Sequence, residues 1–311
     1  GEILTDLNVK NRIISLSSFI LVSVLLSIRN INYFTLVLFG CLGLVIFFAD
    51  KILDNSKITE RTLSAFFVFA VCYQTFFQIF NGVHNNLKQL LVSAALAVFL
   101  AAVFAATDTK KFPYAVISAP LICLLDVRVA SAYCTLLLSL SIVLYLFESR
   151  NTNNKHSKKS TKSKKKQNDR MEFEPKTVTL ISIVTSIAGL TFCVYSAFKN
   201  EAPVVENINF LFSQYKNTLS LIILIVYLLI KLIKSNLRAT VHIIAGLVLH
   251  IIAMIFFTAI YGWTIFSLFL LSTVMFLGLM CLESEETVNE IKSDYHNHRF
   301  LFLVGMLCLL Q

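Results

Sequence analysis

The sequence predicts an all-α protein: a polytopic transmembrane helical bundle of about ten spans with a short interfacial segment at its C-terminal end. Of its 311 residues, 57% are hydrophobic and only 14% are charged, whereas a soluble domain carries roughly 25% charged residues. The apolar residues form long continuous runs without an alternation of period two. Such runs favour transmembrane helices over the strands of a membrane barrel.

Ten apolar runs are the predicted spans. A helix needs ~20 residues to cross the hydrocarbon core of a bilayer, and most of the runs approach that length. The fifth run is short and contains Pro113 and Pro120, so a re-entrant segment is an open alternative for it. The predicted spans are residues 13–28, 31–49, 62–80, 89–106, 112–127, 129–147, 177–198, 218–233, 240–260 and 264–281.

The one long polar interval, residues 148–176, determines the predicted orientation, because loops rich in Lys and Arg remain in the cytosol. With this interval in the cytosol and ten crossings, 22 of the 27 Lys and Arg residues lie on the cytosolic side. We therefore expect an N-terminal membrane bundle of about six spans at 1–147, a cytosolic, polybasic, disordered loop at 148–176, a C-terminal membrane bundle of about four spans at 177–281, and a cytosolic amphipathic helix with an interfacial tail at 282–311.

The segment after the last predicted span has two parts. Val288, Ile291 and Tyr295 have the spacing of one helix face, which is typical of a short amphipathic helix lying on the cytosolic surface of the membrane. Residues 299–311 are apolar but too few to cross a bilayer. We interpret them as an interfacial or re-entrant tail, which leaves both termini in the cytosol.

The polybasic tract within the polar interval has seven lysines in twelve residues. Lysines near an anionic membrane surface contribute ~1 kcal/mol each to binding, so the tract could attract anionic lipids or RNA phosphates. No aromatic residue is interleaved for base stacking, which makes RNA the weaker alternative. The simpler hypothesis, which we favour, is a loop that only sets the topology. The lysines are Lys155, Lys158, Lys159, Lys162, Lys164, Lys165 and Lys166.

A few polar residues lie inside predicted spans. Gln74 and Gln78 are four residues apart in the third span, and His242 and His250 are eight apart in the ninth, which places the two histidines ~80° apart around the helix. Groups of this kind can line a proton path. No intramembrane carboxylate is available to pair with them, so helix packing is the favoured interpretation.

Nothing in the sequence predicts an enzyme. Walker loops, nucleophile elbows, HExxH pairs and dinucleotide fingerprints are all missing, so no catalytic and no cofactor-binding residue is predicted. His296 and His298 form an HxH pair too weak to predict a metal site. The seven cysteines include no CxxC pair and are expected to pack as small apolar residues. Small residues for close helix packing are also expected in the fourth span, at Ala94, Ala95, Ala97, Ala101, Ala102, Ala105 and Ala106.

The two ends of the chain carry a resemblance. Gly1 and the final pair Leu310 and Gln311 match the two sides of cuts made by a chymotrypsin-like viral main protease of the coronavirus type. The chain resembles the multi-spanning membrane subunit that follows the main protease in nidovirus replicase polyproteins. The resemblance covers size, hydrophobicity and termini, without an aligned internal motif. It departs in span number and in the lysine-rich loop.

This resemblance implies a non-enzymatic protein of host endoplasmic reticulum-derived membranes that remodels them and anchors a replication complex. The implied partners are the host membrane with its anionic lipids, other membrane subunits of the replicase, and the main protease as processing enzyme. The alternative is a cellular transporter or channel, with Gln74, His242 or His250 beside its path. A third hypothesis is a scaffold for protein partners that dock on the acidic stretch 283–294.

Overall fold

The computed structural model describes residues 86–106, 111–157, 176–199, 215–235 and 237–282, together with seven residues between 287 and 297. This part of the chain contains helices and no strand, which confirms the all-α class for it. The helices are α5 (Asn86–Ala105), α6 (Phe112–Leu125), α7 (Val127–Ser157), α8 (Lys176–Lys199), α10 (Tyr215–Ser235), α11 (Leu237–Tyr261), the 3-10 turn η1 (Trp263–Ile265) and α12 (Phe266–Leu282).

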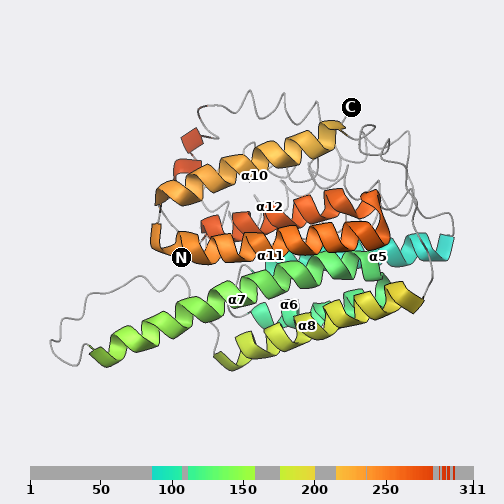
Figure 1. Cartoon of the computed structure of the whole chain (residues 1–311), viewed down its shortest axis with the longest axis horizontal. Helices are drawn as coiled ribbons and strands as arrows, with labels where there is room; N and C mark the ends of the chain where they lie inside the picture. Colours follow the sequence, from blue (N-terminus) through green and yellow to red (C-terminus); the bar gives the residue numbers. More distant parts are fainter. Residues whose placement is uncertain are drawn as a thin grey trace, which may run out of the picture.

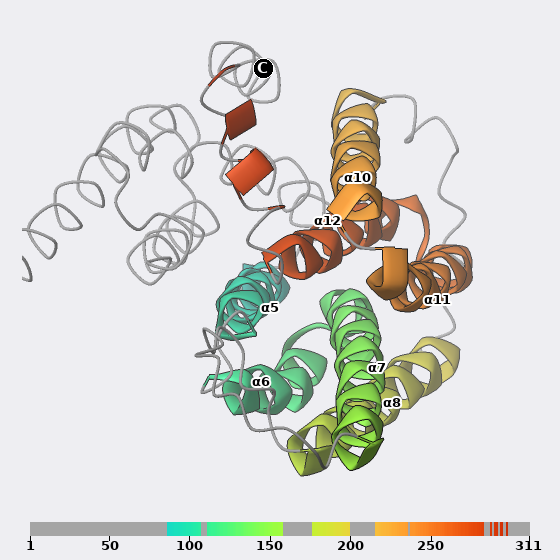
Figure 2. The same cartoon turned by 90° about the vertical axis from the view of Figure 1, so that its left-hand side faces the viewer.

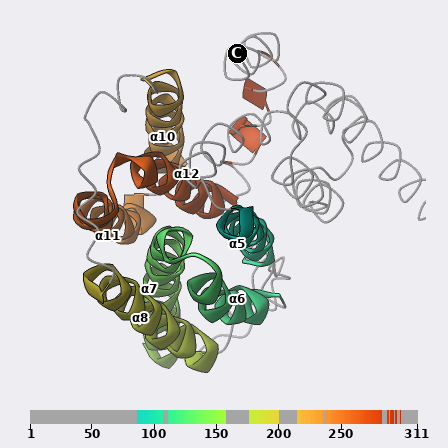
Figure 3. The ribbon, with the colours of Figure 1, turned by 90° about the vertical axis from the view of Figure 1, so that its right-hand side faces the viewer.

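The seven α-helices coincide with the fourth to tenth predicted spans, and the first three spans lie outside the described residues. The helices form one bundle in which α7 is central (Figure 1). It packs against α5, α6, α8, α11 and α12, and α12 packs in turn against α10 and α11. End-on views show α12 between α10 and α7, with α11 beside α12 and also next to α7 (Figures 2 and 3).

Three described helices are long and apolar enough to cross a membrane: α7 over Val127–Leu146, α8 over Thr177–Lys199, and α11 over His242–Tyr261. Of these windows, the one in α7 is 78% buried in the bundle and the other two only 22%. Helix α7 is therefore shielded by protein, while α8 and α11 present apolar side chains outward. These features fit a membrane protein, and the full number of ten spans remains a prediction.

Asp126 separates the fifth and sixth predicted spans by ending α6 and starting α7. Its backbone is extended at the C-cap of α6. Its carboxylate accepts hydrogen bonds from the backbone N–H groups of Arg128 (3.0 Å) and Val129 (3.1 Å), which is the geometry of a helix N-cap. Its second oxygen lies 3.0 Å from the Arg128 guanidinium. The junction is thus held by a charged cap.

Helix α6 corresponds to the fifth predicted span, for which the sequence allows a crossing or a re-entrant segment. It has 14 residues, or ~21 Å of helix, against a hydrocarbon core of ~30 Å. Pro120 lies inside it and lacks the N–H that would bond the preceding turn. The Tyr133 hydroxyl of α7 donates to the carbonyl of Ala115 at 2.6 Å, which ties α6 to the central helix. A crossing and a re-entrant helix both remain open.

One helix boundary and part of one predicted packing surface differ from prediction. Helix α7 continues to Ser157, ten residues past the predicted end at 147, because extending a formed helix avoids a new nucleation step. In α5, the predicted small-residue surface holds only in part, since Ala101 is exposed. Ala95 and Ala102 of that surface are buried, because the neighbouring helices meet α5 on the side that carries these two residues.

Candidate functional site

Small hydroxyl side chains line the contact between α7 and α8. Ser141 of α7 and Ser182 of α8 are fully buried, and their hydroxyl oxygens lie 2.6 Å apart. The Ser141 hydroxyl also donates to the carbonyl of Leu137, one turn earlier, at 2.7 Å. Small polar residues of this kind let helices approach closely and hydrogen-bond across the contact.

His250 of α11 is buried at the contact with α7, with 1% of its surface exposed. Its Nδ1 lies 3.0 Å from the Ser139 hydroxyl and 3.1 Å from the carbonyl of Gly246. Ser139 in turn lies within 3.3 Å of the same carbonyl. Three polar groups from two helices therefore share one small network.

The imidazole of His250 is also fixed from its face. It stacks on the ring of Phe276 from α12, with centroids 5.2 Å apart. A Cβ at Gly246 would lie 2.5 Å from that ring, so only glycine leaves room for it. The network and the stack together join α7, α11 and α12 at one point.

This geometry gives His250 a packing role. The described residues hydrogen-bonded to its ring are Ser139 and Gly246, and Nε2 has no partner there. Either tautomer leaves Nε2 unbonded, because both contacts use Nδ1. No described carboxylate bonds the ring, although a proton relay would be expected to use one. His242 is also buried, whereas Gln74 and Gln78 lie outside the described residues.

Three thiols meet where α6, α7 and α8 come together. Cys123, Cys134 and Cys193 are free and buried, in line with the expected role as small packing residues. A Cβ at Gly189 of α8 would lie 2.6 Å from the Cys134 sulfur and 3.4 Å from that of Cys123. The glycine therefore makes the space for this cluster. Among the described residues, no His, Cys, Asp and Glu group has the arrangement of a metal site.

An ion-pair network was missed by the sequence reasoning. Lys231 of α10 lies 2.8 Å from Asp294 and 3.1 Å from Glu290. The Tyr227 hydroxyl donates to Asp294 at 2.9 Å, and the Lys231 ammonium lies 5.8 Å from the centroid of the Tyr227 ring. Ile291, between the two acids, packs against the hydrophobic core.

The network shows what the predicted amphipathic helix contacts. The described residues between 287 and 297 are helical. They form the acidic segment, which comprises Thr287, Asn289, Glu290, Ile291, Ser293, Asp294 and Asn297. The spacing of these residues could have predicted the contact. Tyr227 and Lys231 are four residues apart, and so are Glu290 and Asp294, so each pair lies on one face of its helix.

Most of the residues predicted to act at the surface lie outside the part of the chain that the structure describes. Lys155 lies on the polar end of α7, while the other six lysines of the tract lie outside the described residues. Gly1, Leu310, Gln311, His296 and His298 lie outside them too, as do Val288 and Tyr295. The structure therefore shows three separate clusters: the histidine network, the thiol cluster and the ion pairs of α10. Apart from Lys155, the lysines of the polybasic tract lie outside the described residues.

No protein-family model, curated protein or solved structure matches this chain. Its function is therefore argued from its own residues.

Proposed function

We propose that this chain is a non-enzymatic membrane protein of a viral replicase, which remodels host endoplasmic reticulum membranes and anchors the replication complex. The observation that supports a structural, non-enzymatic role is the way in which the buried polar groups are hydrogen-bonded. In the described bundle, Ser139, Ser141, Ser182 and His250 bond to neighbouring helices or to their own backbone. The replicase setting is the one that the resemblance implies.

The charges support a scaffold over a transporter. Within the three helices that are long enough to cross, Arg128 and Lys199 stand at window ends, and the window in α11 contains no charged residue. Transport paths and proton relays are normally marked by ionisable groups facing the bundle interior. In these three windows no Asp, Glu, Lys or Arg lies away from the ends, and the buried basic side chains are the histidines His242 and His250. Such a bundle is better suited to holding shape in a membrane than to moving charged solutes.

Two polar elements supply contacts beyond the bundle in this proposal. The polybasic tract at Lys155–Lys166 would attract anionic lipids of the cytosolic leaflet, with RNA as a weaker alternative. The acidic segment, held on α10 by Lys231, would offer a surface to other membrane subunits of the replicase. The viral main protease would act on the chain only as a processing enzyme.

The test is expression of the chain in cells, followed by electron microscopy of the endoplasmic reticulum. We expect paired or curved membranes in place of normal sheets and tubules. Changing the seven tract lysines to glutamine should weaken the effect, and changing them to arginine should preserve it, because arginine keeps the charge. Normal membranes, with the chain alone and with its partner subunits, would refute the proposal. Remodelling that ignores the glutamine changes would leave the tract a purely topological role.

A transporter or channel is the second candidate. It is favoured by one observation: Nε2 of the buried His250 has no partner among the described residues, so the ring retains a free site for a proton. If this candidate holds, proteoliposomes containing the chain should carry a proton current that His250→Asn removes. Absence of any current would eliminate it.

A further inference from the structure

The turn between α11 and α12 is short and has a special backbone. Gly262 has φ 87° and ψ −178°, a region open essentially only to glycine. Its N–H donates to the carbonyl of Thr258 at 2.9 Å, which closes the last turn of α11. The chain then passes through η1 (Trp263–Ile265) directly into α12. Two helices are thus joined with almost no loop between them.

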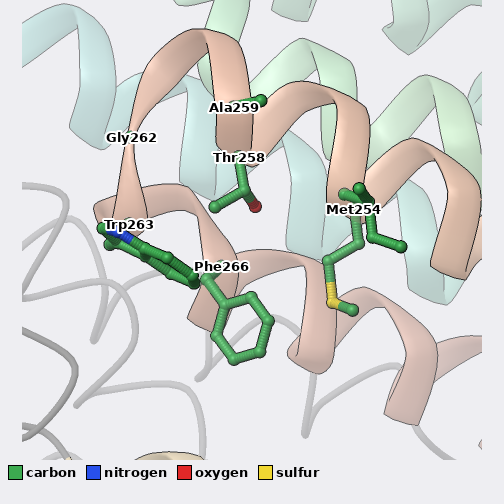
Figure 4. A pocket seen from close by; sticks show the side chains of 7 residues that line it. Met254, Thr258, Ala259, Gly262, Trp263 and Phe266 are labelled. Atoms are coloured by element: carbon green, nitrogen blue, oxygen red, sulfur yellow. The ribbon is translucent and has the colours of Figure 1, made fainter. Parts of the chain in front are cut away.

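Beside this turn lies a half-open hollow of about 360 Å³, within the usual size range of small-molecule sites, ~300–1,000 Å³. Figure 4 shows the side chains of Met254, Thr258, Trp263 and Phe266 arranged around it. Ala259 and Gly262 complete most of the wall. The lining contains no charged residue, so it offers nothing to a phosphate or carboxylate headgroup.

The wall has one unsatisfied polar atom. The Thr258 hydroxyl is buried and has no hydrogen-bond partner in the described structure. Buried hydroxyls are normally paired, and an unpaired one is unfavourable. The indole of Trp263 supplies the other polar side-chain group of the lining, and it can only donate. The hollow is therefore apolar, with places for a single small polar group.

The hollow lies on an exposed, apolar side of α11, the side that would face lipid if α11 crosses the membrane. Ile252 and Ile255 are 59% and 64% exposed on this helix, within a window apolar enough to cross a membrane. Tyr261 and Trp263 stand at the turn, and such aromatic residues gather at the membrane–water interface. From Gly262 to Met254 the hollow follows ~12 Å of helix, leading from the interface into the hydrocarbon.

We propose that this hollow binds a neutral membrane lipid with a rigid apolar body and one hydroxyl group, the sterol class. The ring system lies against Trp263 and Phe266, and its hydroxyl exchanges a hydrogen bond with Thr258. Phospholipids are disfavoured because their charged headgroups find no partner in the lining. The site is independent of the replicase proposal, since it requires only that α11 faces lipid.

The experiment uses the full chain in phosphatidylcholine nanodiscs with a photoreactive sterol, read by mass spectrometry of labelled peptides. Label is expected in the peptide containing residues 254–266, competed by cholesterol. Cholesterol methyl ether should compete about fivefold less well, because it loses one hydroxyl donor. Thr258→Val should weaken cholesterol by a similar factor and remove its advantage over the ether.

Matched variants separate a site from general lipid contact. Ala259→Trp fills the hollow and should abolish labelling of this peptide. Ala245→Trp is the control, because Ala245 is also exposed on α11 and lies outside the lining. Equal losses in the two variants, labelling that survives Ala259→Trp, or equal labelling by a photoreactive phosphatidylcholine would overturn the proposal. Size-exclusion chromatography checks that each variant is folded and monodisperse.

Discussion

Glycines determine how closely the central helices approach. At Gly246 and Gly189 an added Cβ would lie within 2.6 Å of a neighbouring side chain. The neighbour of Gly246 is Phe276, which is fully buried and stacked on His250, so it has no free space to move into. At Gly278 nothing lies within 4 Å of the added atom. An added methyl group therefore has no room at Gly246 and Gly189 but ample room at Gly278.

At this scale, we predict that Gly246→Ala lowers the free energy of unfolding by about 1–3 kcal/mol, the usual result of overpacking a filled core. Unfolding in mixed detergent micelles, followed by circular dichroism, measures it. Gly278→Ala is the matched control. It should be neutral or stabilising by up to ~1 kcal/mol, because alanine favours a helix over glycine. Equal effects of the two substitutions would contradict the packing described here.

At the scale of elements, the acidic segment docks on α10 instead of only lying on the membrane surface. The network places the Lys231 ammonium between two carboxylates, with the Tyr227 hydroxyl on one of them. Glu290 is 44% and Asp294 34% exposed. Such partly solvated pairs contribute ~0–1 kcal/mol each, so the ion pairs themselves hold the segment only weakly.

We predict that Lys231→Met raises the amide hydrogen exchange of residues 287–297 about fivefold, the factor that corresponds to losing ~1 kcal/mol of ion pairing. Lys234→Met is the control, since Lys234 is an exposed lysine one turn along α10. Raising the salt concentration should reproduce the effect in the unmodified chain, because these charges are partly exposed. Equal exchange in both variants would show that Ile291 and its apolar contacts alone hold the segment.

For the whole molecule, α6 decides whether the N-terminus and the polybasic tract lie on the same side of the membrane, given that the other predicted spans before the tract cross. Its 14 residues are short for the bilayer, but local thinning accommodates short helices at modest cost. If α6 crosses, the N-terminus and the polybasic tract are on one side of the membrane. If α6 re-enters, they are on opposite sides.

We predict that they share the cytosolic side, because this arrangement places most basic residues in the cytosol. Epitope tags at the N-terminus and within residues 158–166 measure it in cells with a selectively permeabilised plasma membrane. Both tags should be accessible to antibody before the internal membranes are opened. An N-terminal tag that stays protected while the loop tag is stained would establish the re-entrant arrangement.

The sequence alone determined the class of the molecule and the location of its described helices. The apolar runs at 129–147, 177–198 and 240–260 coincide with α7, α8 and α11, because a bilayer selects helices by the transfer free energy of consecutive residues. It also singled out His242 and His250 as polar residues of one span.

Only the tertiary structure decided what those residues meet. Ser139 and His250 are 111 positions apart, and Lys231 and Glu290 are 59 apart. Their contacts depend on which faces of distant helices come together, and this is not encoded in local hydropathy. The hollow beside Thr258 follows from the same cause, since it exists only where the turn at Gly262 folds α12 back along α11. Local transfer energies place helices in a membrane, and three-dimensional packing creates their sites.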